Sequence, residues 1–75
     1  MDILTITPEQ IANNYTAALD SVTVINELMA LDSRDDAQTY TVARNVEHLE
    51  LMVAKDYWTT EDLSPFNDAI TAGKA

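Results

Sequence analysis

Two of the four cationic side chains of this sequence lie close to its only histidine. Arg44, His48 and Lys55 follow one another at helical spacing, and on a helix they share one face with Leu51. The formal net charge of the chain is −9, so a cationic strip stands out. The strip could be a solvated flank, with Arg44 paired to Glu47 and Lys55 in the last helical turn, where a cation complements the helix dipole.

The same strip could instead be an interface. Leu51 places an apolar side chain between the cations, and a second copy of the chain could offer the acidic helical face of Asp20 and Glu27. Both interpretations stay open from the sequence. The candidate interface residues are Arg44, His48, Leu51 and Lys55.

The residues needed for a metal centre or for nucleophilic catalysis are poorly arranged. The order Glu47-His48-Leu49-Glu50 does not give the Glu-x-x-His spacing of di-metal carboxylate bundles. The three serines fall in cap, turn or helix-surface positions, none is flanked by a glycine-rich elbow, and the lone histidine has no evident serine partner. We therefore expect no metal, no cofactor and no enzymatic activity.

These side chains would be positioned by two long helices. Thr7, Pro8 and Gln10 form a capping-box start with proline at the first helical position, and Asp35 with Gln38 offers a second box. Apolar residues then recur at steps of three and four, which predicts helices over 8–31 and 36–57. The short break between them favours an antiparallel hairpin. The apolar stripes contain Ile11, Tyr15, Ala18, Val22, Ile25 and Met29, then Val42, Val46, Leu49, Val53 and Tyr57.

A short third helix is predicted over 65–72. Ser64 and Pro65 give a cap-plus-proline start, and Gly73 is expected to end the helix. We expect this tail to close the open end of the hairpin together with the N-terminal segment, with Trp58 buried. The predicted closing cluster is Ile3, Leu4, Ile6, Tyr57, Trp58, Leu63, Phe66 and Ile70.

Length and composition bound the class of protein. The 75 residues allow one domain, 1–75, with an all-α fold, and so short a chain buries a small share of its surface, which favours pairing into a larger helical bundle, most simply a dimer. Thirteen acidic against four basic residues disfavour direct nucleic-acid binding and anionic membranes. No signal peptide or membrane span is recognisable, so a cytoplasmic location is expected.

The run from Arg44 to Leu63, with a Thr-Pro-Glu-Gln-Ile start upstream, resembles small acidic open reading frames of marine tailed phages and marine metagenomes. The resemblance covers most of the chain. It implies a phage accessory, assembly or minor virion protein that acts in a bacterial cytoplasm or in the virion. It implies no activity, so no functional residue is carried over from it.

Two functions follow as expectations. The first is a non-enzymatic helical module for protein–protein interaction, which pairs with itself or binds another protein. The alternative is an acidic inhibitor or nucleic-acid mimic that occupies a basic groove of a host protein. Mimicry of phosphates needs carboxylates arrayed along one face, whereas here they are scattered along the chain.

Overall fold

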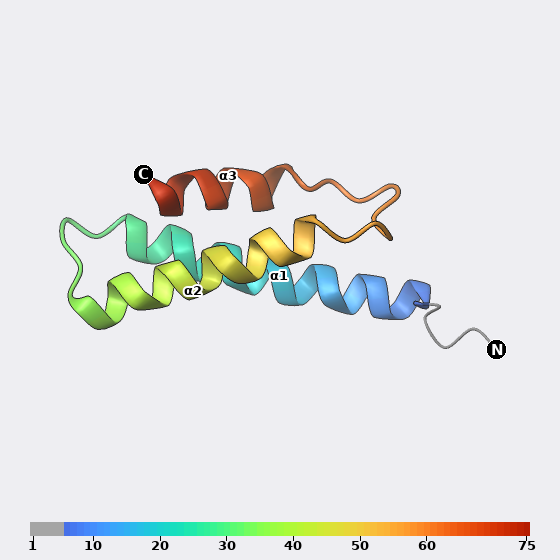
Figure 1. The fold of residues 1–75 in the computed structure, drawn as a ribbon, viewed down its shortest axis with the longest axis horizontal. Helices are drawn as coiled ribbons and strands as arrows, with labels where there is room; N and C mark the ends of the chain where they lie inside the picture. The colour runs from blue at the N-terminus through green and yellow to red at the C-terminus, as the bar shows by residue number, and fades with distance from the viewer. Residues whose placement is uncertain (1–5) are drawn as a thin grey trace.

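The computed structural model describes residues 6–75, and this part of the chain forms three α-helices and no strand (Figure 1). Helix α1 spans Pro8–Met29, α2 spans Asp36–Val53 and α3 spans Ser64–Lys74. Helices α1 and α2 form the antiparallel hairpin (Figure 1). The all-α fold class predicted from the sequence is confirmed.

Both long helices begin where the sequence predicts. The Thr7 hydroxyl accepts a hydrogen bond from the Gln10 backbone N–H at 3.1 Å, and the Gln10 side chain accepts one from the Thr7 N–H at 3.0 Å. Asp35 and Gln38 make the same reciprocal pair, at 2.7 and 3.0 Å. Each box satisfies two backbone donors that the first helical turn leaves without partners.

The two long helices end earlier than predicted. Helix α1 ends at Met29 instead of residue 31, and α2 ends at Val53 instead of residue 57. The early end of α2 has a visible cause at the Met52 carbonyl, which accepts both the Lys55 N–H at 3.2 Å and the Trp58 indole N–H at 2.7 Å. These bonds turn the chain out of the helix, so Lys55 and Tyr57 lie beyond α2.

Helix α3 is longer than predicted at both ends. It begins at Ser64, so the N-cap residue is Leu63 and not Ser64 as predicted; the Ser64 N–H donates to the Asp62 carboxylate at 2.9 Å. It also continues through Gly73 to Lys74. The backbone of Gly73 has no positive φ angle, so this glycine does not act as a left-handed helix terminator.

The third helix runs back along the hairpin, antiparallel to α2, and does not merely close its open end (Figure 1). Its buried residues Phe66 and Ala69 join the core, and Gly73 near its C-terminus lies against Val46 and Ile25. One chain therefore forms a three-helix bundle without a second copy. The buried apolar core is Ala18, Ile25, Val42, Val46, Leu49, Phe66 and Ala69.

Candidate functional site

The four candidate interface residues do not form one uniform strip. Arg44 and Leu51 are exposed on α2, with 67% of Leu51 accessible, whereas His48 is half-buried. Lys55 is exposed but lies beyond the end of α2. It is therefore not in the last helical turn, as predicted. No ion pair joins Arg44 to Glu47; within residues 6–75 the structure contains one, between Lys74 and Glu50.

His48 is directed toward α1, where it meets Ser21. The Ser21 hydroxyl oxygen lies 2.8 Å from His48 Nδ1. Ser21 is only 6% exposed. The sequence prediction that the serines lie at the surface, with no partner for the histidine, is wrong for Ser21. Its helical spacing from Ala18 and Ile25, which are both in the core, is the signal that could have revealed it.

A serine–histidine hydrogen bond also occurs in acyl-transfer sites, so its surroundings decide what it can do. Such sites add free backbone N–H donors for the oxyanion and a third group that orients the histidine. Ser21 instead lies in the middle of α1, where backbone N–H groups are bonded within the helix. Within the described part of the chain, the second ring nitrogen of His48 has no hydrogen-bond partner. This geometry is that of an interhelical hydrogen bond that satisfies a buried hydroxyl.

An aromatic cluster joins the α2–α3 connection to α1. The Trp58 ring lies 4.8 Å from Tyr57 and 6.4 Å from Phe66 between centroids. Tyr15 of α1 meets Trp58 edge to face at 6.0 Å and 74°, and lies 4.9 Å from Phe66. Trp58 is half-buried, less than we expected, and its indole N–H is satisfied by the carbonyl of Met52. Tyr15 is the member that was not placed in the closing cluster from the sequence.

Other predicted members of the closing cluster lie around these rings or outside the described part of the chain. Leu63 and Ile70 are partly buried and pack against the core. Ile6 is half-buried. Ile3 and Leu4 lie outside the described residues.

Two polar contacts hold the α2–α3 connection against α1. The Tyr15 hydroxyl donates to the Asp62 carbonyl at 2.7 Å, and the Asn14 amide donates to the Tyr57 hydroxyl at 3.1 Å. Both contacts join residues more than forty positions apart in the sequence. The aromatic cluster and its polar contacts are thus structural elements that fix how α3 returns along the hairpin.

Two carboxylates of the same connection are stabilised in their charged forms. Backbone N–H groups, that of Thr59 foremost, lower the pKa of Glu61 below its ordinary value. The Ser64 backbone N–H lowers the pKa of Asp62 in the same way. Both carboxylates are at the surface and accept hydrogen bonds from backbone N–H groups one or two residues away, so their adjacency reflects local backbone chemistry.

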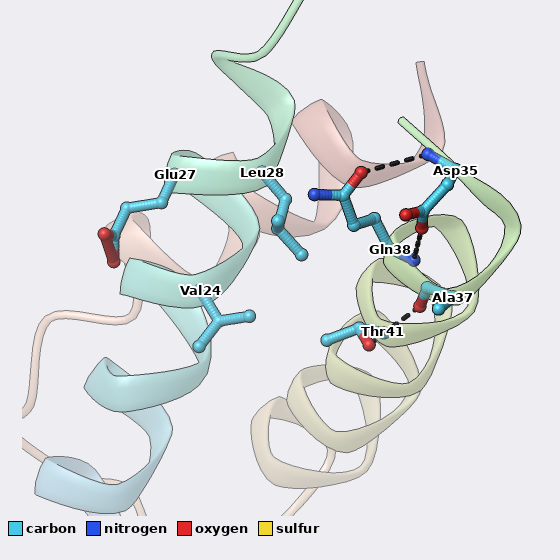
Figure 2. Close-up of a pocket in the computed structure, with 7 residues that line it drawn as sticks. All are labelled: Val24, Glu27, Leu28, Asp35, Ala37, Gln38 and Thr41. Carbon is cyan, nitrogen blue, oxygen red and sulfur yellow. Dashed lines mark hydrogen bonds between the residues drawn. The ribbon is translucent and has the colours of Figure 1, made fainter. Parts of the chain in front are cut away.

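A groove opens between α1 and α2 near the hairpin turn (Figure 2). It has a volume of about 410 Å³ and is open to solvent. Val24 and Leu28 of α1 face Ala37 and Thr41 of α2 across it (Figure 2). The lining residues are Val24, Glu27, Leu28, Asp35, Ala37, Gln38 and Thr41, and none of them belongs to α3. The groove therefore lies on the face of the hairpin that α3 leaves uncovered.

Residues 6–75 contain neither a membrane-spanning helix nor a cluster of metal ligands. None of the helices described has the length and apolar content needed to cross a bilayer. No group of three or more histidine and acidic side chains in this range could hold a metal ion.

Comparisons of the chain with protein-family models, with curated protein sequences and with solved structures found no match.

Proposed function

We propose that the protein is a non-enzymatic helical module for protein–protein interaction that pairs with a second copy of itself. The observation that supports this proposal most directly is the groove between α1 and α2. Its floor carries Val24 and Leu28, which are accessible to a partner although α3 covers the other face of the same hairpin. Apolar side chains lining an uncovered groove are typical of a surface that binds another protein.

The chemistry of the polar groups supports a binding role over a catalytic one. Among residues 6–75, no oxyanion donors and no orienting group of the kind that hydrolysis would use lie at Ser21 and His48. Glu61 and Asp62 hold backbone N–H groups of the α2–α3 connection, so they are not placed to exchange protons with a substrate. The setting we propose is that of a phage accessory or assembly protein in the bacterial cytoplasm or in the virion, on the resemblance described above.

The test is the molar mass of the purified chain as a function of concentration, by multi-angle light scattering or sedimentation equilibrium. We expect the mass to rise from that of the 8.3 kDa monomer toward twice that value. The transition should be reversible on dilution. A monomer that keeps its mass and a cooperative unfolding transition at every concentration would refute the self-pairing part of the proposal.

A further inference from the structure

The four cations of the chain fall into two groups. Lys74 of α3 is paired with Glu50 of α2. The Arg34 guanidinium donates to the carbonyls of Leu28 and Leu31 at 3.1 and 3.2 Å. Arg44 and Lys55, by contrast, make no ion pair or side-chain hydrogen bond within residues 6–75, although the chain carries thirteen acidic residues. Within the described residues these two cations are thus left without an acidic partner.

The acidic side chains that could meet them lie on the opposite border of the same face. Glu27 borders the groove on the α1 side, and Asp20 lies two helical turns before it on that side of α1. Arg44 follows Thr41, a groove residue of α2, by one turn, and Leu51 lies two turns further along. The face opposite α3 therefore has an acidic border on α1, while on the α2 side Asp35 lies at the hairpin turn and Arg44 lies further along the helix.

We propose that two copies of the chain dock through this face, around a two-fold axis that runs along the groove. The inference rests on the proposed function and specifies its surface. Such an axis exchanges the two sides of the groove, so α1 of each copy lies over α2 of the other. It leaves the position of each residue along the groove axis unchanged. Glu27 of one copy then lies within one helical turn of Arg44 of the other, and symmetry makes this contact twice.

Electrostatics selects this arrangement among the ways of stacking two such faces. Each copy carries a net charge of −9, so the copies repel unless their few cations meet acids. An axis across the helices would lay α1 on α1, with Glu27 and Asp20 facing the same acids of the other copy, and would lay Arg44 near Arg44. Placing like charges together disfavours that orientation. The α1-on-α2 arrangement instead brings Arg44 of each copy near Glu27 of the other.

The apolar part of the face supplies the contact area. Val24 and Leu28 of both copies meet across the joined grooves, which removes these side chains from water. Leu31, just beyond the end of α1, is also exposed, at 43%. A second copy offers both a cation for Glu27 and an acid for Arg44, whereas a uniformly basic partner would leave Arg44 without an acid.

The test is a charge swap, read by sedimentation equilibrium of the full-length chain. Glu27→Arg and Arg44→Glu should each weaken the dimer at least about tenfold, because each places like charges together across the interface. The double variant Glu27→Arg/Arg44→Glu should return to within about threefold of the parent, since the pair is re-formed with its signs exchanged. Both positions are exposed, so circular dichroism should show the parent's helix content in each variant.

Asp68→Arg is the matched control, because it changes the net charge as Glu27→Arg does but lies on an exposed site of α3. It should leave the dimer as strong as the parent, or stronger through reduced repulsion. A parent dimer that responds equally to Glu27→Arg and Asp68→Arg, with no recovery in the double variant, would overturn the proposed surface while self-pairing stands. A parent that is monomeric at every concentration would overturn both.

Discussion

Gly73 tests whether the C-terminal turn of α3 is seated on the hairpin. A Cβ atom added at this position would overlap Val46 Cγ2 and would lie 3.4 Å from both Ile25 Cγ2 and Val42 Cγ1. Val46 cannot easily turn away, because a β-branched side chain in a helix has one strongly preferred rotamer. Gly73→Ala should therefore force α3 outward.

The magnitude follows from two opposing contributions. Overpacking of a core by one methyl group costs about 1–3 kcal/mol. Replacing glycine by alanine in a helix interior gains up to about 1 kcal/mol, and less here because Gly73 is the second-last residue of α3. We expect a net loss of about 1–2 kcal/mol in the free energy of unfolding, measured by urea denaturation. For so small a domain each kcal/mol lowers the melting temperature by about 4–8 °C.

A double-mutant cycle with Val46→Ala sharpens the assay. Removing the methyl groups that overlap the new Cβ should make Gly73→Ala nearly neutral, with a coupling energy of about 0.5–3 kcal/mol between the two sites. Thr71→Ala, at an exposed position on the same helix, should change stability by no more than about 0.5 kcal/mol. If Gly73→Ala raises stability as at an open helical site, the seating of α3 against Val46 is refuted.

Three other predictions address separate contacts. Trp58→Ala should cost about 2–3 kcal/mol by urea denaturation, below the roughly 3–5 of a fully buried aromatic residue because Trp58 is half-buried; Tyr40→Ala, at a side chain 65% exposed, should cost less than about 0.5 kcal/mol. Arg34→Ala should cost about 1 kcal/mol, since the carbonyls of Leu28, in the last turn of α1, and Leu31, just beyond it, lose a charged donor; an unchanged midpoint would show that water replaces the guanidinium. Asp62→Asn should be less stable than the parent at neutral pH, and the difference in unfolding free energy should close as the pH falls below the usual carboxyl range. The Ser64 N–H lowers the pKa of Asp62, so the stabilisation by this carboxylate is present above its unfolded pKa and is lost as the pH falls through its folded pKa. A difference in stability that persists in acid would contradict this cause.

The parts of the fold that the sequence predicts well depend on neighbours within one helical turn. Thr7 with Gln10 and Asp35 with Gln38 place donor and acceptor three residues apart, so both helix starts can be predicted from residue type alone. The apolar stripe of α2 is equally local, and Val42, Val46 and Leu49 are all buried as expected. These features would appear in any fold that contains the two helices.

The parts that the sequence mispredicts depend on residues distant along the chain. Helix α2 stops at Val53 partly because the Trp58 indole reaches back to the Met52 carbonyl. The sequence predicts Gly73 as a helix terminator, whereas in the structure Val46, on another helix, occupies the space that a Cβ at Gly73 would need. Ser21 and His48 are 27 residues apart. In each case the deciding partner is brought by tertiary packing, which residue type does not specify.

The two faces of the hairpin differ in composition, and the difference bears on how pairing would relate to folding. The face under α3 is apolar, and Ile25, Val42 and Val46 lie there against Gly73. The groove face mixes Val24 and Leu28 with acidic, amide and hydroxyl side chains. Obligate interfaces resemble a divided core and are more hydrophobic than transient ones.

A mixed face of this kind favours a chain that folds first through α3 and pairs afterwards. The unfolding transition of the monomer should then persist in variants that lose the dimer, such as Arg44→Glu. That separation allows the charge swap to report on the interface alone, because Glu27 and Arg44 are both exposed and contribute nothing to the buried core. If the single variants instead lost their helix content together with the dimer, pairing would be a condition of folding, and α3 would not be sufficient to complete the bundle.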